Sequence, residues 1–282
     1  MPPVTSQLAD LSVGDTAPVR VMGVLNVSPE SFYGGSVHTR LDRLIQAAEQ
    51  QVSEGADIID LGAMSTAPYL KTHISEAEET DRLAPAIEAL TARLDVPVSA
   101  DTKRAGVARA ALAAGARLIN DVSGLKHDPA MAGCVAEAGV SVVLMASEPS
   151  PGRGSPPGRI HTALNDSLAL ARRAGIPTGR IVLDPGIGFF RQPQIAWHEW
   201  DCTALRELGG LRSFGLPLLV GASRKSFIGK ITGQSEAAGR LAGSLACAAI
   251  AVYNGAHIIR AHDVAETWQT VRMAERLRPV LA

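Results

Sequence analysis

The sequence predicts a single domain of the α/β class, folded as a (β/α)8 or TIM barrel, and three observations lead to this prediction. Short apolar runs of strand type alternate along the chain with longer runs of helical periodicity. Eight such pairs occur, and they fit in about 260 residues, the usual length of this barrel. No glycine fingerprint follows the first apolar run, 20–26, so a doubly wound sheet is only the second alternative.

The predicted elements follow one another in regular order after a lead-in at residues 1–19, and the barrel extends over 20–282. The predicted strands are 20–26, 57–62, 97–101, 117–121, 141–145, 180–184, 217–221 and 256–260. Helical periodicity is clearest in 40–54, 76–94, 104–114 and 263–278. The small apolar residues of 241–256 predict a further, closely packed helix that ends at Gly255.

Composition excludes several classes of protein. The chain of 282 residues is 46% hydrophobic and 20% charged, with a formal net charge of −1, which argues against bulk attraction to nucleic acid or membranes. The first 20 residues lack the apolar core of a signal peptide, and no run reaches the length of a membrane span, so we expect a cytoplasmic protein. Cys134, Cys202 and Cys247 lack metal or redox spacing and are expected to be reduced core residues.

Polar residues stand at the ends of most predicted strands, where a barrel of this class places its active site. One such residue would be explained by a turn or a helix cap. Because all strand ends meet at one rim, their convergence predicts a site there. The polar ends are Asn26, Asp101, Asn120 with Asp121, Asp184, Arg224 with Lys225, and Arg260 with His262.

The predicted site is mixed in charge. Carboxylates such as Asp101 and Asp184 can accept hydrogen bonds from a flat heterocycle that carries several N–H groups, whereas Lys225, Arg260 and His262 can donate to an anion. The loops after the seventh and eighth strands often form a phosphate site in these barrels. We therefore expect Arg260 and His262 to bind a departing phosphate or pyrophosphate. In the alternative interpretation, Arg260 pairs with Asp263 or another rim carboxylate.

Seven stretches of the chain resemble the dihydropteroate synthase family, in the correct order from about residue 20 to 278. They are GVLNVSPESFYGGS (23–36), GADIIDLGAMSTAP (55–68), VSADTKRAGVARAALAAGARLINDVSGL (98–125), IVLDPGIGF (181–189), LLVGASRKSFIG (218–229), GRLAGSLA (239–246) and GAHIIRAHDV (255–264). The resemblance implies an enzyme that transfers a pterinylmethyl group. It would condense 6-hydroxymethyl-7,8-dihydropterin pyrophosphate with p-aminobenzoate to give 7,8-dihydropteroate and pyrophosphate, and it would act as a homodimer with Mg²⁺.

The same resemblance implies a role for each matching position. The residues implied in catalysis are Asp101, Asp184, Lys225, Arg260 and His262. The pterin pocket would contain Asp101, Asn120, Met145, Asp184, Phe189 and Lys225, and the pyrophosphate would meet Asn26, Arg260 and His262. Asn26 would also hold the Mg²⁺, because this ion commonly binds few protein oxygens together with substrate phosphates. The p-aminobenzoate side would contain Thr66, Pro68, Phe190, Ser226 and Phe227.

The chain departs from the family pattern mainly on the aminobenzoate side. After the second strand the family typically reads Glu-Ser-Thr-Arg-Pro-Gly, whereas residues 64–69 read MSTAPY, so that Ala67 replaces the arginine. Arg191 or Lys71 is a candidate to compensate. The sequence GFF at 188–190 is also found in sulfonamide-insensitive relatives of the Sul type, which lack the same arginine. We therefore hypothesise that the enzyme discriminates p-aminobenzoate from sulfonamides.

Two other functions remain open from the sequence. Pterin-binding methyltransferases that pass a methyl group to a corrinoid protein share the barrel and its pterin-contacting residues, but they bind no pyrophosphate. The motifs SRKSFIG (223–229) and RAHD (260–263) therefore favour the synthase. A pterin-binding relative without turnover is the second alternative, and the replacement at Ala67 is its main support.

Overall fold

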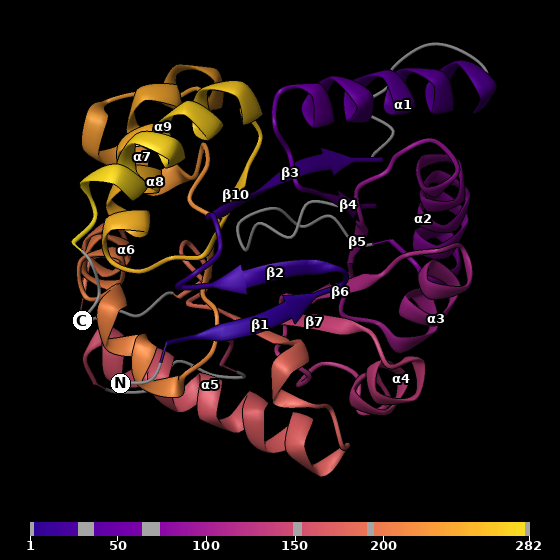
Figure 1. Ribbon diagram of the computed structural model, residues 1–282, viewed down its shortest axis with the longest axis horizontal. Coiled ribbons are helices and arrows are strands. Elements are labelled where there is room, and N and C mark those ends of the chain that lie inside the picture. The colour runs from indigo at the N-terminus through magenta and orange to yellow at the C-terminus, as the bar shows by residue number, and fades with distance from the viewer. Residues whose placement is uncertain (1–2, 28–36, 64–73, 149–153, 191–194, 280–282) are drawn as a thin grey trace.

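The computed structural model describes residues 3–27, 37–63, 74–148, 154–190 and 195–279, and it confirms the predicted barrel. In this part of the chain eight parallel strands form one sheet, in the order β8-β7-β6-β5-β4-β3-β10-β9. A parallel bridge between Leu183 and Leu218 joins β8 to β9, so the sheet closes on itself. Figure 1 shows the helices arranged around the strands in chain order.

The bounds of the predicted strands agree with the structure to within two residues. The strands are β3 (Arg20–Asn26), β4 (Ile58–Gly62), β5 (Val98–Asp101), β6 (Leu118–Asp121), β7 (Ser141–Met145), β8 (Ile181–Asp184), β9 (Leu219–Val220) and β10 (Ile258–Ala261). The shortest is β9. It begins later than predicted, and Pro217 at the predicted start has no amide hydrogen to donate to the sheet.

The helices that the periodicity predicts are also present, together with shorter ones. They are α1 (Val37–Ser53), α2 (Glu76–Thr91), α3 (Ala105–Ala113), α4 (Met131–Ala138), α5 (Pro156–Arg173), α6 (Trp197–Arg206), α7 (Ser226–Thr232), α8 (Leu241–Tyr253) and α9 (Val264–Leu277). The short 3-10 helices η2 (Thr178–Arg180), η3 (Leu208–Phe214) and η4 (Ala237–Arg240) lie in connections. None of the helices in the described ranges is both long and apolar enough to cross a membrane.

The inside of the barrel changes from apolar to polar along the strands. Toward the amino ends of the strands, the inside is filled by a separate hydrophobic cluster made of Leu8, Val13, Met22, Ile58, Leu118, Val143, Val182, Leu219 and Ile258. Because side chains of a strand alternate between its two faces, the residue two positions later points inward as well. Those next inward positions are Val24, Asp60, Asn120, Met145, Asp184, Gly221 and Arg260, of which four carry polar side chains. The alternation therefore places a polar layer directly above the apolar one, toward the carboxyl ends of the strands.

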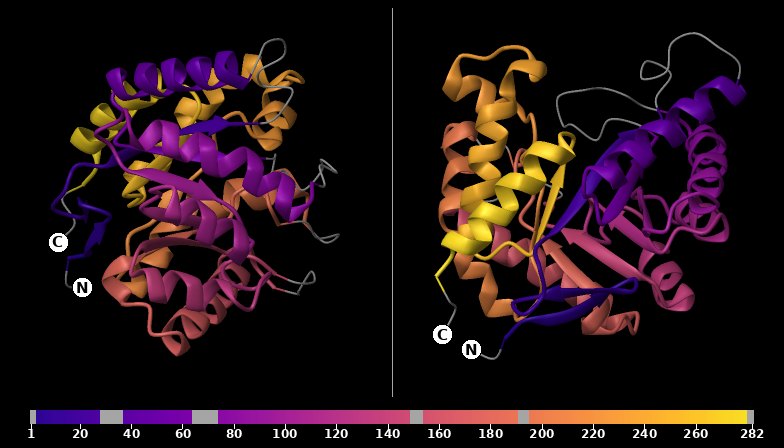
Figure 2. Two further views of the ribbon diagram at one scale, coloured as in Figure 1. Left: turned by 90° about the vertical axis from the view of Figure 1, so that its right-hand side faces the viewer. Right: turned by 45° about the horizontal axis from the view of Figure 1, so that its top comes forward.

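A β-hairpin that the sequence analysis did not predict lies in the lead-in and covers the other end of the barrel. Its strands are β1 (Thr5–Leu8) and β2 (Leu11–Gly14), which pair antiparallel. Leu8 and Val13 are 1% and 2% exposed and belong to the cluster inside the barrel. The amide of Ala9 donates to the hydroxyl of Ser141, the first residue of β7, at 3.1 Å. Figures 1 and 2 show the hairpin at this end of the molecule.

A partly buried ionic cluster fastens the hairpin to the last part of the chain. The carboxylate of Asp15 accepts hydrogen bonds from Nη1 and Nη2 of Arg212 at 2.8 and 2.9 Å and from the amide of Val4 at 2.7 Å. His257 is 1% exposed, and its Nδ1 accepts the amide hydrogen of Leu218 at 3.0 Å. Its proton must therefore sit on Nε2, which faces Asp15 at 3.2 Å. Desolvation lowers the pKa of His257, in agreement with a neutral imidazole.

We expect Asp15→Asn to lower the free energy of unfolding by about 2 kcal/mol at pH 7, because it weakens charge-assisted hydrogen bonds. Burial raises the pKa of Asp15, but the bonds from Arg212, Val4 and His257 outweigh it and hold the pKa well below its usual range. A depressed pKa stabilises the fold above the unfolded value of about 4 and loses this effect as the pH falls further. In urea denaturation the difference between wild type and variant should stay constant from pH 7 to 5 and shrink toward pH 3. A constant difference over the whole range would contradict the assignment.

Candidate active site

The structure brings most of the predicted site residues together at the carboxyl ends of the strands. Asn26, Asp101, Met145 and Asp184 are the last residues of β3, β5, β7 and β8. Asn120 lies in β6 and Arg260 in β10, both on the inner face of the barrel. Lys225 directly precedes α7, in the connection that follows β9. Thr66 and Pro68, and the positions Ala67, Lys71 and Arg191, lie outside the described residues.

Arg260 is bound by two buried carboxylates inside the barrel. Its Nε donates to Oδ2 of Asp60 at 2.7 Å and its Nη2 donates to Oδ2 of Asp101 at 3.0 Å. The alternative interpretation of the sequence is therefore right that Arg260 pairs with a carboxylate at this end of the barrel. It is wrong about Asp263, which forms an ion pair with Arg224 instead, with Nε of Arg224 at 2.8 Å.

Asp60 is the main residue that the sequence analysis missed. It lies in the middle of β4 and is 0% exposed. Besides Arg260, its Oδ2 also accepts a hydrogen bond from Nδ2 of Asn120 at 2.9 Å. One signal for it was present in the sequence, namely an acidic residue between the apolar residues of 58–61, where an unpaired charge would be costly.

Asp101 has an unusual proton affinity for a carboxyl group. Burial raises its pKa, the charge of Arg260 opposes this shift, and the nearby charges of Asp60, Glu79 and Asp121 raise it again, to about 7. Two carboxylates that share one guanidinium in a buried space do not both ionise easily, which explains the direction of the shift. The site can therefore take up or release a proton near neutral pH.

Asp184 and Lys225 face each other across the loop that follows β8. Oδ1 of Asp184 accepts the amide hydrogen of Gly186 at 2.7 Å. Burial raises the pKa of Asp184, and the charge of Lys225 opposes this shift. The ammonium of Lys225 donates to the carbonyl of Ile187 and lies 4.6 Å from the centroid of the Phe189 ring. A Cβ on Gly188, whose φ is +85°, would lie 2.9 Å from Cδ of Lys225, so this position needs a glycine.

His262 is held at the rim by Ser223. The hydroxyl of Ser223 accepts the amide hydrogen of His262 at 3.2 Å, and it lies 3.1 Å from Nδ1. Since the hydroxyl hydrogen remains available for Nδ1, the Nε2–H tautomer fits this geometry. Desolvation and the positive charge of Arg260 lower the pKa of His262 to about 4. At pH 7 His262 thus offers a neutral N–H donor rather than a positive charge.

The residues predicted for the aminobenzoate side lie in different surroundings. Ser226 is the first residue of α7 and is partly exposed. Phe190 and Phe227 are 5% and 1% exposed and belong to the large hydrophobic core between strands and helices. The ring of Phe190 stacks on Trp200, with 5.1 Å between the centroids. The two phenylalanines therefore pack in the core beneath the connections that follow β8 and β9, rather than facing the site.

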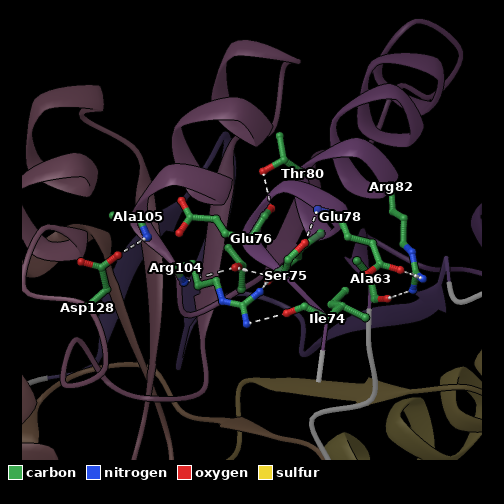
Figure 3. Close-up of polar contacts among 12 residues, drawn as sticks. Ala63, Ile74, Ser75, Glu76, Glu78, Thr80, Arg82, Arg104, Ala105 and Asp128 are labelled. Carbon is green, nitrogen blue, oxygen red and sulfur yellow. Dashed lines mark hydrogen bonds and ion pairs between the residues drawn. The ribbon is translucent and has the colours of Figure 1, made fainter. Parts of the chain in front are cut away.

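A second polar network lies beside the site, at the beginning of α2 (Figure 3). Arg104 pairs with Glu79 and donates from Nη2 to the carbonyl of Ile74 at 2.9 Å. Arg82 donates to the carbonyl of Ala63 at 3.4 Å. The two arginines thus hold the described residues on either side of the 64–73 segment. The sequence analysis did not single out any of these residues.

Asn26 is the predicted magnesium ligand, and the structure allows a limited test of it. Its side chain is partly buried, at the end of β3 and on the same strand face as Met22. The described residues contain no group of three or more His, Cys, Asp or Glu side chains that could hold a metal ion.

The fold and site together define a barrel enzyme whose polar residues converge inside the carboxyl-terminal end of the strands. Residues 22–262 match the family model described as pterin binding enzyme. The chain therefore belongs to the pterin-binding enzyme family.

Similar proteins of known name agree with this assignment. The dihydropteroate synthase of Synechocystis sp. is 40% identical over 264 residues, which cover 91% of this chain and 89% of that protein. The structure of the Xanthomonas albilineans dihydropteroate synthase with 4-aminobenzoic acid superimposes with a TM-score of 0.88 at 36% identity, covering 99% and 100% of the two chains. A structure of that enzyme with 7,8-dihydropteroate gives 0.85 at 35% identity, covering 98% and 100%.

The pKa of Asp101 leads to a prediction about stability. Because the folded protein binds this proton more tightly than the unfolded chain does, the stabilisation is complete below pH 4 or so and is lost as the pH rises through about 7. Asp101→Asn removes the titrating group. We expect the stability of this variant relative to wild type to increase between pH 5 and pH 8, as measured by urea denaturation. The prediction fails if the relative stability is the same at both pH values.

Proposed function

We propose that this protein is a dihydropteroate synthase, which joins 6-hydroxymethyl-7,8-dihydropterin pyrophosphate to p-aminobenzoate and releases pyrophosphate. The observation that carries the proposal is the close arrangement of Asp60, Asp101 and Arg260 inside the barrel of a chain that matches dihydropteroate synthases over about nine tenths of its length. The relatives do not favour either alternative, the corrinoid methyltransferase or the pterin-binding protein without turnover.

In this proposal the buried polar layer holds the pterin. Asp101, Asn120 and Asp184 hydrogen-bond the heterocycle, Lys225 donates to it from above Phe189, and Met145 packs on its face. Met145 is 2% exposed at the end of β7, which suits an apolar contact at the bottom of a pocket. The negative charge of the carboxylates stabilises the positive charge that develops on the pterinylmethyl carbon as its bond to oxygen breaks.

The opposite side of the site binds the leaving group. Arg260 can exchange its bond to Asp101 for one to a pyrophosphate oxygen while it stays bound to Asp60. His262 donates its Nε2–H, and Lys225 adds a further positive charge. A Mg²⁺ ion held by Asn26 and the substrate would neutralise part of the pyrophosphate charge.

The second substrate attacks without a strong base. An arylamine is neutral at pH 7, so its nitrogen lone pair can form the new C–N bond while the C–O bond to pyrophosphate breaks. The excess proton then leaves the nitrogen for water or the released pyrophosphate. His262 is suited to hold the anion rather than to accept this proton, because its Nδ1 is bonded to Ser223. Ser226 is the described residue that we assign to the aminobenzoate side.

We also propose that the enzyme acts as a homodimer, with residues 1–19 as the lead-in to one barrel domain. Helix α8 carries two large apolar side chains on the surface, Ile250 and Tyr253, which are 50% and 48% exposed. Such a face is suited to contact a second copy of the chain. The cytoplasmic location remains a prediction from the sequence.

Pyrophosphate release tests the proposed activity directly. We expect the purified protein to release pyrophosphate when it receives dihydropterin pyrophosphate, p-aminobenzoate and Mg²⁺, and to stop when any one of them is omitted. Lys225→Ala should lower kcat/KM by about 100-fold, because the leaving group and the ring lose a charged donor. Equal activity of the variant would contradict the assigned role of Lys225. Binding of the pterin without any release in the wild type would favour the alternative without turnover.

Sulfonamide inhibition tests the proposed discrimination between inhibitor and substrate. Phe190 packs on Trp200 where the family more often has glycine, and the second-loop arginine is replaced by Ala67. We expect the inhibition constant of sulfamethoxazole to exceed the KM for p-aminobenzoate. An inhibition constant well below that KM would show that the enzyme is an ordinary sulfonamide target.

A further inference from the structure

Asp60 occupies a position from which it cannot reach a ligand at the rim. It is in the middle of β4, paired in the sheet with Val24 of β3 and Ser99 of β5, and its exposure is 0%. The strand continues to Gly62, which pairs with Asp101 one level higher. Asp60 is therefore one inward position below Gly62 and Asp101 on these two strands, and its side chain is fully buried within the polar layer.

Its two partners belong to strands that are not neighbours of β4. Asn120 is in β6 and Arg260 is in β10, and in the closed sheet β5 separates β4 from β6 while β3 separates β4 from β10. Both side chains reach across the barrel interior to one oxygen, Oδ2 of Asp60, with distances of 2.9 Å and 2.7 Å. A single buried carboxylate thus fixes residues on both of its sides.

The contact to Arg260 leaves part of the guanidinium free to change partner. Nε is bound to Asp60, which is fully buried, whereas Nη2 is bound to Asp101 at the strand end. With Nε held by Asp60, the rotation of the guanidinium is restricted, and Nη2 lies toward the strand end where it contacts Asp101. An anion there can replace Asp101 as the partner of Nη2 without moving the rest of the side chain.

The contact to Asn120 determines which way its amide faces. Because Nδ2 donates to Asp60, rotation of the amide by half a turn would place Oδ1 against a carboxylate oxygen. The carbonyl oxygen and the second N–H of Asn120 therefore have fixed positions, so the amide presents its acceptor and its remaining donor to the pocket in one arrangement only. This order matters for a heterocycle, whose donors and acceptors also have a fixed order.

The second oxygen of Asp60 points to a role other than stability. Oδ1 is buried and has no hydrogen-bond partner among the described residues. Buried ion pairs that are incompletely satisfied contribute little or nothing to the stability of a fold compared with apolar residues of the same size. Stability therefore does not explain why a carboxylate is buried at this position. Holding Arg260 and Asn120 in place does explain it.

We propose that Asp60 is a positioning residue for this reaction, which holds Arg260 and Asn120 in the orientations that bind the pyrophosphate and the pterin of one substrate. The inference rests on the proposed function, since it assigns these two partners to one ligand. Asp60 itself does not touch the ligand. Its removal should therefore weaken the binding of dihydropterin pyrophosphate and leave the aminobenzoate side unchanged.

Two substitutions separate the hydrogen bonds from the charge. Asp60→Leu removes the acceptor and replaces it with a larger apolar side chain of the same branching, and we expect the Kd for dihydropterin pyrophosphate, measured by calorimetry with Mg²⁺ and without p-aminobenzoate, to rise about 100-fold. Asp60→Asn keeps an oxygen that can accept both bonds, and we expect a rise of about 10-fold. In both variants the KM for the pterin substrate should rise, whereas the KM for p-aminobenzoate changes less than about twofold.

Asp15→Asn is the matched control, because Asp15 is a partly buried carboxylate that is also bonded to an arginine, and it lies at the other end of the barrel. It should lose stability in urea but bind the pterin substrate as wild type does. In the Arg260→Met variant, Asp60→Asn should raise the Kd for dihydropterin pyrophosphate by a smaller factor than it does in the wild type, because Asp60 has already lost one of its two partners. If Asp60→Leu does not fold, Asp60→Asn in the wild type and in the Arg260→Met variant still tests whether Asp60 positions its partners.

The inference is overturned if the wild type is active while the Asp60 variants that fold bind the pterin substrate normally. It is also overturned if Asp15→Asn weakens binding as much as Asp60→Asn does, or if the effects of Asp60 and Arg260 are simply additive. A wild type that neither binds dihydropterin pyrophosphate nor releases pyrophosphate overturns the proposed function, and this inference with it. The two failures are thus distinguished by the wild type alone.

Discussion

The site depends on a guanidinium that is held between two carboxylates inside a closed barrel. A single charge of either sign would be too costly in such an interior, so Arg260 needs Asp60 and Asp101, and they need Arg260. Burial, together with the nearby charge of Asp60, raises the pKa of Asp101 to about 7 although Arg260 opposes this shift. Substrate binding can shift the balance because it offers the guanidinium a third partner.

Much of the fold and part of the site could be predicted because both depend on local sequence. Strand and helix periodicity determines the order of the barrel, and each strand end brings its own last residue to the rim. Asn26, Asp101, Asp184 and Arg260 could therefore be found strand by strand. The resemblance to a family added roles for these residues that the pattern alone does not contain.

What could not be predicted depends on pairs of residues that are distant in the sequence. Asp60 stands in mid-strand, and its partners Asn120 and Arg260 belong to strands that are each separated from β4 by one other strand, so the contacts form only inside the folded barrel. For the same reason, the sequence suggested Asp263 as a partner of Arg260, whereas in the structure Asp263 forms an ion pair with Arg224. The hairpin at Thr5–Leu8 and Leu11–Gly14 was missed because its strands have four residues each and too few apolar side chains to form a strand-type run, although Leu8 and Val13 are buried.

The attachment of the hairpin has a consequence for how the chain folds. Asp15 forms its partly buried contacts with Arg212 and His257, which are 197 and 242 residues further along the chain. During synthesis from the first residue onward, the hairpin cannot complete these contacts until nearly the whole barrel has emerged. Contacts of such long sequence separation slow folding, because the entropy of closing the loop is lost before the contact forms. The hairpin thus completes its contacts with Arg212 and His257 only after the chain on both sides of β9 has reached its final place.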